Sequence, residues 1–256
     1  MDIKIIVATH KKYQMPEDPM YIPVHVGAEG KDDLGYLKDN TGDNISSKNK
    51  NYCELTGLYY MWKNMEADYK GIVHYRRHFV SPTAKGSKQE RIIKNEELSE
   101  ILKTTDIVLP KKRNYYIEST YDQYAHAHHH EDLDETRKII EEKYPDYIPN
   151  FDKVMKLTSG HRFNMMIMKS EILDEYLTWL FDILFELENR VDISAYSAND
   201  SRIFGFVSER LLDVWLYTKG YTYRELPYAF MEKQNWIVKG SKFVLRKMGI
   251  KNTKYR

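Results

Sequence analysis

The chain has 256 residues, and its 39 basic and 38 acidic side chains give a formal net charge of +1. That near balance argues against a dedicated nucleic-acid-binding protein, which usually carries a clear excess of basic residues. The single cysteine, Cys53, excludes an intramolecular disulfide framework and fits a reducing compartment.

The sequence contains no linker rich in Gly and Ser or in Pro, so we expect one large domain over residues 1–238 and a basic tail over residues 239–256. The first residues lack the basic region, long apolar run and cleavage site of a secretory signal. No apolar run approaches the roughly 18 residues that span a bilayer. We therefore expect a cytoplasmic protein.

The first expected element is a strand over residues 3–8, Ile-Lys-Ile-Ile-Val-Ala. Its β-branched and nearly continuous apolar character predicts a central parallel strand buried on both faces. Thr9, His10 and Lys11 follow its carboxyl end, where the first loop of an α/β fold meets a nucleotide. An ordinary polar loop is the alternative. Residues 21–26 predict a second, short strand.

A helix is predicted to begin near Asn51, because apolar residues recur at helical spacing over residues 55–62. Asn51 is the expected N-cap, and Glu54 three residues later completes a capping box, which gives Glu54 a structural role. The free N–H groups and the dipole of a helix favour an anion just before its first turn. The residues in that position are Asn44, Ser47, Lys48 and Asn49, and Asn44, Lys48 and Asn49 are the donor-site candidates. A turn held by polar side chains is the alternative.

Residues 71–79, Gly-Ile-Val-His-Tyr-Arg-Arg-His-Phe, predict a buried strand that leads directly into hydrogen-bonding and cationic side chains. Ligands of open α/β sheets bind beyond the carboxyl ends of the strands, so His74 and Tyr75 become candidates for ligand contact. Arg76 and Arg77 offer forked donors that suit phosphate oxygens. Adjacent residues of an extended chain point to opposite faces, so the alternative is that only one arginine faces the site.

The rest of the chain alternates helices with strands, which indicates an α/β sheet. Helices are expected over residues 95–103, 170–189 and 199–218, and strands over 106–109 and 165–168. His161 and Asn164 precede the last of these strands, where they either meet an acceptor or cap the turn. The histidine run at residues 126–131 predicts no zinc site, because no Cys or second ligand cluster accompanies it.

Three stretches of sequence carry a family resemblance. They are residues 44–64, with Tyr-Cys-Glu-Leu-Thr-Gly-Leu-Tyr-Tyr-Met-Trp-Lys-Asn, residues 71–79, with His-Tyr-Arg-Arg, and residues 208–212, Ser-Glu-Arg-Leu-Leu. The chain resembles, over about residues 3–232, a bacterial capsule-biosynthesis family once described only as a domain of unknown function. That family includes galactofuranosyltransferases of capsular and surface polysaccharides. The resemblance implies an α/β fold, a single Rossmann-like glycosyltransferase type-A (GT-A-like) domain.

The resemblance also implies site residues. In many type-A enzymes the strand after the donor-site helix ends in Asp-x-Asp, which holds a divalent metal, but residues 74–77 contain no carboxylate here. We therefore expect no essential metal and no other cofactor. Glu209 precedes Gly220 at about the spacing that the catalytic carboxylate of inverting type-A enzymes shows, which makes Glu209 the expected base. Asp200 and Asp192 are the alternatives.

The activity that the resemblance implies is inverting transfer of a sugar, first of all galactofuranose, from a UDP-sugar to a lipid-linked growing saccharide. Glu209 would remove the acceptor proton, and Arg76 or Arg77 would stabilise the leaving diphosphate. The alternative is a non-catalytic saccharide-binding or scaffold subunit of a polysaccharide assembly complex. The tail at residues 239–256 alternates basic and apolar residues, so we expect peripheral contact with an anionic membrane surface.

Overall fold

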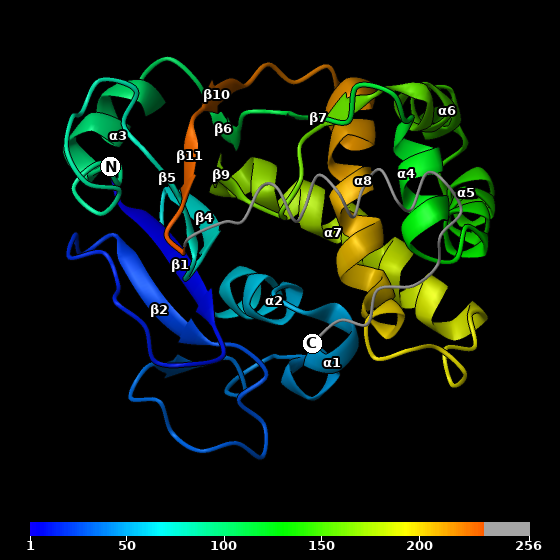
Figure 1. Ribbon diagram of the computed structural model, residues 1–256, viewed down its shortest axis with the longest axis horizontal. Helices are drawn as coiled ribbons and strands as arrows, with labels where there is room; N and C mark the ends of the chain where they lie inside the picture. The colour runs from blue at the N-terminus through cyan, green and yellow to red at the C-terminus, as the bar shows by residue number, and fades with distance from the viewer. Residues whose placement is uncertain (233–256) are drawn as a thin grey trace.

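A nine-stranded mixed sheet organises residues 1–232, the part of the chain that the computed structural model describes (Figure 1). Seven strands lie in the order β10-β6-β9-β4-β1-β2-β3, and β5 and β11 continue from β4. The strands are β1 (Ile3–Thr9), β2 (Tyr21–His25), β3 (Leu37–Lys38), β4 (Tyr69–His74), β5 (Arg77–Phe79), β6 (Ile107–Pro110), β9 (Met166–Lys169), β10 (Arg224–Leu226) and β11 (Tyr228–Phe230). A separate two-stranded sheet consists of β7 (Arg113–Asn114) and β8 (Ser159–Gly160).

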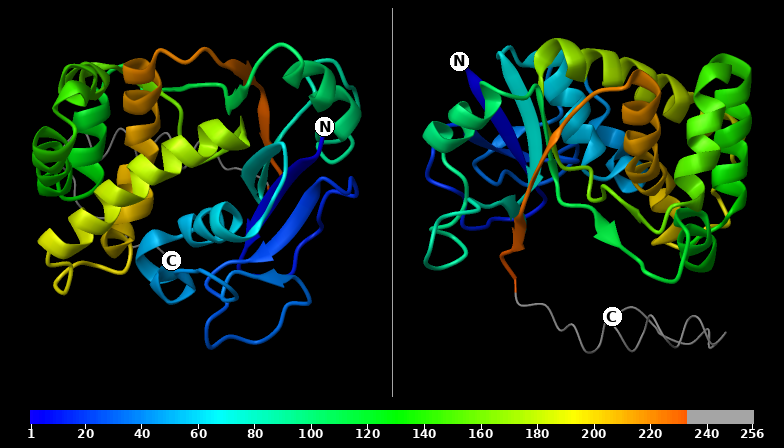
Figure 2. Two further views of the ribbon diagram at one scale, coloured as in Figure 1. Left: turned by 180° about the vertical axis from the view of Figure 1, so that it is seen from behind. Right: turned by 90° about the horizontal axis from the view of Figure 1, so that it is seen from above.

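Helices cover both faces of the sheet. They are α1 (Asn49–Tyr52), α2 (Leu55–Asn64), α3 (Asn95–Leu102), α4 (Thr120–Ala127), α5 (Glu131–Lys143), α6 (Ile148–Lys156), α7 (Ser170–Arg190) and α8 (Ile203–Lys219), with short 3₁₀ turns η1 (Ser46–Lys48), η2 (Pro145–Tyr147) and η3 (Asp200–Arg202). Figure 2 shows α3 on one face and α2 and α7 on the other, with α8 and α4 to α6 farther out. No helix among residues 1–232 combines the length and apolarity needed to cross a membrane.

Strand β1 is buried on both faces, as its sequence predicts. Ile6 and Ala8 belong to the large core that α2, α7 and α8 cover, whereas Ile5 and Val7 belong to a smaller core under α3. Because successive side chains of a strand alternate between faces, one continuous apolar run supplies both cores. The α/β class predicted from the sequence is confirmed.

Parallel pairing aligns the carboxyl ends of three strands. β1 pairs with β2 through Thr9 and His25 at its end, and with β4 through Ala8 and His74. β9 is antiparallel to both β4 and β6, so the sheet is mixed rather than purely parallel. The order β4-β1-β2 places a topological switch point beside the end of β1, which is where α/β sheets bind ligands.

The capping box predicted for residues 51–54 is wrong. The helix is divided into α1 and α2 by Cys53, whose φ of 53° lies in the left-handed region. Asn51 instead donates its side-chain N–H to the Ser201 carbonyl oxygen at 2.7 Å. Glu54 makes no side-chain capping bond to α2, so its carboxylate is available for another role. The basic tail predicted over residues 239–256 lies outside the described residues.

Candidate active site

A cavity of about 490 Å³ opens beyond the carboxyl ends of β1 and β4. Its walls come from the loop after β1, the loop after β4, the start of α1 and the turn before α8. Cavities of this size hold small-molecule ligands and cofactors. Its lining includes His10, Lys50, Glu54, His74, Arg76 and Arg202.

The cavity carries a clear positive charge. Lys31, Lys50, Arg76 and Arg202 line it, and Glu54 is the carboxylate among its described lining residues. Burial lowers the pKa of His10, and the neighbouring charge of Lys11 lowers it further. Cations that converge on a concave surface attract an anionic ligand such as a diphosphate.

Arg76 and Arg77 have different environments. Arg76 is exposed and lines the cavity, as a ligand-binding arginine would. Arg77 is 8% exposed, and its guanidinium carbon lies 4.0 Å from the ring centre of Phe163 and 5.1 Å from that of Phe230. Burial lowers the pKa of Arg77 to about 10, while the negative charge of Glu209 opposes that shift. The extended backbone thus sends one arginine into the cavity and the other into an aromatic layer.

The three candidate residues in the loop after β1 have different environments. His10 lines the cavity, and its ring meets the ring of Tyr75 edge-on at 5.3 Å between centroids. Lys11 places its ammonium 5.0 Å from the centre of the Tyr75 ring and 3.4 Å from a Glu232 carboxylate oxygen. Thr9 is buried, and its hydroxyl donates to the Lys11 carbonyl oxygen at 2.6 Å. Thr9 thus shapes the turn that presents His10, and its donor contact stays a prediction.

Of the three candidates around the start of α1, one lines the cavity. Asn49 lines the cavity, and its amide donates to the Cys53 carbonyl oxygen at 2.7 Å. Asn44 only supports a local turn, since its side-chain oxygen accepts from the Ser46 N–H at 3.1 Å. Lys48 donates to the Glu188 carboxylate on α7 at 2.5 Å. In this structure both side chains bond within the fold, and the donor contacts of Asn44 and Lys48 stay predictions.

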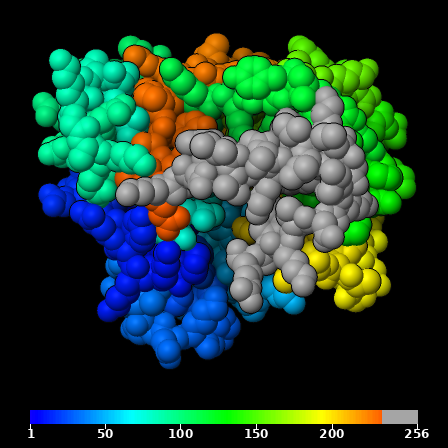
Figure 3. Space-filling model, in the orientation of Figure 1, coloured from blue at the N-terminus to red at the C-terminus, as the bar shows by residue number. Residues whose placement is uncertain are grey.

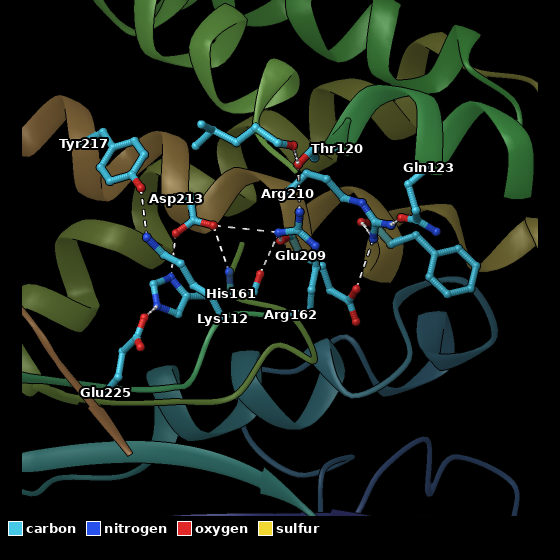
Figure 4. Close-up of polar contacts among 12 residues, drawn as sticks. Lys112, Thr120, Gln123, His161, Arg162, Glu209, Arg210, Asp213, Tyr217 and Glu225 are labelled. Carbon is cyan, nitrogen blue, oxygen red and sulfur yellow. Dashed lines mark hydrogen bonds and ion pairs between the residues drawn. The ribbon is translucent and has the colours of Figure 1, made fainter. Parts of the chain in front are cut away.

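His161 lies in a buried polar network rather than on a surface (Figure 4). Its side chain is fully buried, with Nδ1 2.5 Å from Asp213 and Nε2 3.1 Å from Glu225. Asp213 also lies 3.7 Å from the guanidinium of Arg162. The network joins the loop after β8 to α8 and β10. Because its side chain is fully buried, His161 supports the fold in this structure, and its acceptor contact stays a prediction.

Asn164 is buried and bonded on both sides of its amide. Its Nδ2 donates to Glu54 Oε1 at 2.7 Å and to the Gly205 carbonyl oxygen at 3.1 Å. Its Oδ1 accepts from the Ser208 hydroxyl at 2.6 Å. Its amide thus connects α8 to the carboxylate of Glu54, and the acceptor contact of Asn164 stays a prediction.

Glu209 lies on α8 with its side chain one-fifth exposed. Its Oε2 is 3.0 Å from Arg210, and its main-chain oxygen accepts from Arg162 at 3.2 Å (Figure 4). It is absent from the described lining of the cavity at the end of β1. Of its alternatives, Asp200 bonds His128 and Asp192 accepts from the Ser194 N–H.

Residues that could hold a metal do not gather in the described part of the chain. Among residues 1–232, no group of three or more His, Cys, Asp or Glu side chains is arranged to bind an ion. In the histidine run, His126 bonds Glu118, His128 bonds Asp200 and His130 bonds Asp134. The independence of a metal remains a prediction that activity measurements must test.

The last described strand, β11, lies beside the loop that carries Arg76. β11 pairs antiparallel with β5, and the Met231 N–H donates to the Arg76 carbonyl oxygen at 2.9 Å. In the space-filling view, β11 in orange lies beside the blue N-terminal segment (Figure 3), consistent with the pairing of Lys11 and Glu232. The loop after β1 and the residues after β11 thus meet beside the loop that carries Arg76.

Comparison with known proteins places this geometry in context. A family model described as a domain of unknown function (DUF4422) matches residues 4–220. The chain is similar to the apo structure of WbbM, a bifunctional glycosyltransferase, with 30% sequence identity and a TM-score of 0.85. The match covers 91% of this chain and 46% of that chain, so this chain spans about half the length of WbbM. No curated protein matches the chain.

Proposed function

Since the chain belongs to the DUF4422 family and has the fold of part of a bifunctional glycosyltransferase, we propose that it transfers a sugar from a nucleotide-sugar donor. The observation that carries the proposal is the cationic cavity at the switch point of the sheet. A nucleotide diphosphate brings negative charge that Lys50, Arg76 and Arg202 can neutralise. α/β folds hold nucleotides in the crevice beyond the carboxyl ends of their strands, where this cavity lies.

The reaction in this proposal is inverting displacement at the anomeric carbon. As the bond to the diphosphate breaks, negative charge grows on the leaving group, and fixed cations stabilise it most at that moment. Arg76 takes that role because it is exposed to the cavity. A carboxylate removes the proton from the acceptor hydroxyl. Glu209 is the candidate from sequence spacing, and Glu54 is the candidate that lines the cavity.

The substrates follow from the resemblance of the sequence motifs to capsule-biosynthesis enzymes. We propose UDP-galactofuranose as the first donor to test and a lipid-linked saccharide of a capsular or surface polysaccharide as the acceptor. The reaction is proposed to need no divalent metal, because residues 74–77 present His, Tyr and two Arg where many related enzymes present carboxylates. Such an enzyme would work at the cytoplasmic face of the membrane.

Ligand-induced stabilisation tests the donor. At 100 times the dissociation constant a bound ligand stabilises the folded protein by about 2.7 kcal/mol, which raises the melting temperature of a chain of this size by roughly 5–10 °C. We expect UDP and UDP-sugars to produce this shift, and a saccharide without nucleotide to produce none. A shift with the saccharide alone would favour the non-catalytic saccharide-binding subunit.

Transfer itself is measured with a panel of UDP-sugars and a lipid-linked acceptor, and the linkage of the product is read by NMR. We expect an inverted anomeric configuration and full activity in a chelator. Loss of all activity in EDTA that magnesium or manganese restores would contradict metal independence. Absence of both nucleotide binding and transfer would contradict the proposed function.

A further inference from the structure

We infer that Glu54 is the catalytic base and that Asn164 is the positioning residue that holds its carboxylate. The inference rests on the proposed glycosyl transfer and assigns the proton acceptor of that reaction. Glu54 precedes α2 directly, and its side chain is 14% exposed while it lines the cavity. The carboxylate is therefore shielded from bulk water yet open to a ligand, as a general base must be.

The amide of Asn164 fixes Glu54 in one orientation. The Gly205 carbonyl oxygen can only accept a hydrogen bond, so the Asn164 atom 3.1 Å from it must be the nitrogen. The same nitrogen donates to Glu54 Oε1 at 2.7 Å. The Ser208 hydroxyl, bonded at 2.6 Å, holds the other end of the amide. No hydrogen bond within residues 1–232 occupies Glu54 Oε2, which leaves that oxygen for an acceptor proton.

The backbone that presents Asn164 is held in an unusual conformation. Phe163 has φ of 80° and Asn164 has φ of 50°, both in the left-handed region. That region is unfavourable for a bulky residue such as Phe, and costs of this kind persist at sites where the surrounding structure requires them. His74 supplies part of the restraint, since its Nε2 lies 2.5 Å from the Phe163 carbonyl oxygen. The loop is therefore built to place Asn164 against Glu54.

Glu209, the other candidate base, is paired with an arginine on α8. Glu209 forms an ion pair with Arg210 at 3.0 Å and is absent from the described lining of the cavity, whereas Glu54 shares that lining with Arg76 and Arg202. A base must lie close to the group it deprotonates, and the cations that receive the leaving diphosphate must lie close to the same reacting carbon. Glu54 meets both requirements.

The proposed step balances its atoms as follows. The O–H bond of the acceptor hydroxyl breaks, and the proton moves to a carboxylate oxygen of Glu54. The acceptor oxygen forms a bond to the anomeric carbon as the bond from that carbon to the diphosphate oxygen breaks. The electron pair of that bond leaves with the nucleoside diphosphate, whose charge Arg76 stabilises. Glu54 later releases the proton to water.

The test compares Glu54→Gln and Glu209→Gln in the full chain, with a UDP-sugar and a soluble saccharide acceptor. Glutamine keeps the size of the side chain and its bond to Asn164. We expect kcat of Glu54→Gln to fall about 100-fold or more, with UDP affinity and melting temperature kept, and a smaller loss for Glu209→Gln. Added formate should restore part of the activity of Glu54→Ala, because a small carboxylate can replace the missing base.

The role of Asn164 is tested by Asn164→Ala, for which we expect kcat to fall about 10-fold while KM for the donor stays unchanged. A purely structural role would instead change KM and kcat together, whereas a lower melting temperature is expected in either case, because Asn164 bonds Gly205 and Ser208. If Glu54→Gln keeps most of its turnover while the wild type is active, the inference is overturned and the proposed function stands. If the wild type transfers no sugar from any donor, the proposed function fails and the inference fails with it.

Discussion

Arg76 and Arg77 are neighbours in sequence, but their side chains serve different purposes. Arg76→Ala should weaken UDP binding about 10- to 100-fold, because a hydrogen bond between charged partners contributes roughly 1.5–3 kcal/mol. Its melting temperature should stay near that of the wild type, since the side chain is exposed. Arg77→Ala should mainly lower the melting temperature, because it removes the group that packs between Phe163 and Phe230.

Isothermal titration with UDP and thermal unfolding of each variant check this asymmetry. Lys85→Ala is the matched control, since Lys85 is an exposed cation in a loop and is not among the residues that line the cavity. Equal losses of UDP affinity in Arg76→Ala and Arg77→Ala would show that both arginines touch the donor.

Three histidines whose side chains are largely buried make stability depend on pH. Burial lowers the pKa of His74 to about 3, and those of His78 and His128 to about 4, below the ordinary value of 6.5. Below pH 6.5 these histidines therefore bind protons in the unfolded chain but stay neutral in the folded chain. We expect these histidines to leave the free energy of unfolding unchanged above pH 6.5. As the pH falls from 6.5 to 4, they should lower it.

The size of this effect can be isolated at His78, whose side chain is almost fully buried. Each such histidine lowers the free energy of unfolding by up to about 1.4 kcal/mol for each pH unit of acidification. His78→Phe keeps an aromatic ring but cannot take up a proton, so its stability should fall less steeply with acid than that of the wild type. Denaturant unfolding at pH 7, 6 and 5 measures the two slopes, and identical slopes would contradict the assignment.

The site residues divide into those that the sequence reveals and those that it hides. His10, His74, Tyr75 and Arg76 follow strands that the apolar pattern predicts, so their place beside the cavity follows from the rule for parallel strand ends. Arg202 is far away in sequence and reaches the cavity through the turn before α8. The spacing of residues within one segment cannot predict that two distant segments line the same cavity, because this depends on the path of the chain between them.

At the scale of elements, strand β4 depends on a close approach to β9. A Cβ atom on Gly71 would lie 2.7 Å from the Met166 carbonyl oxygen and 2.8 Å from Ile167 Cγ1. Because a main-chain oxygen cannot move without shifting the strand, we expect Gly71→Ala to lower the melting temperature by several degrees and to reduce donor affinity. Both effects arise because β4 leads directly into His74 and Arg76.

Gly205→Ala is the matched control for this substitution, because its added Cβ would lie 3.4 Å from the Cys53 side chain, an ordinary contact. Alanine is favoured over glycine in a helix by about 1 kcal/mol, so α8 should become slightly more stable. Differential scanning calorimetry of the two variants and the wild type measures the contrast. An unchanged melting temperature in Gly71→Ala would mean that the sheet adapts without cost.

The helix near residue 51 explains why the role proposed for Glu54 is not visible in the sequence. Asn51 followed three residues later by Glu54 fits the capping-box pattern, and the apolar spacing after it fits a helix. Tertiary contacts decide otherwise: Asn51 bonds Ser201 and Glu54 bonds Asn164. Local patterns predict that a helix exists more reliably than they predict how it begins, because partners distant in sequence compete for its first polar side chains.

At the scale of the whole molecule, the fold class is predicted from the order of apolar strands and amphipathic helices. Residues 3–8, 21–26 and 165–168 become β1, β2 and β9 within a residue or so of the expected bounds. The antiparallel direction of β9 and the short strands β5 and β11 are not predicted. They depend on which strands meet across the sheet, and the periodicity of a single strand contains no such information.

Membrane association is predicted for the basic segment at residues 239–256, which contains seven basic residues and no acidic one. Each cation near an anionic surface contributes about 1 kcal/mol, so removal of this segment should release the protein from vesicles rich in anionic lipid. Flotation of the full and shortened proteins measures the release. Activity on a lipid-linked acceptor should fall more than activity on a soluble acceptor. Equal flotation at low salt would contradict the membrane role.

The pairing of β11 with β5 has a consequence for biosynthesis. The chain emerges from the ribosome with its N-terminus first, so β1, β4 and β5 are available before residues 228–230 have been made. Until then the outer edge of β5 is unpaired, and the main-chain oxygen of Arg76 lacks the N–H of Met231. The loop that carries Arg76 is thus among the last parts of the fold to be completed. A nascent chain halted after α8 would present an open strand edge to other chains and to chaperones.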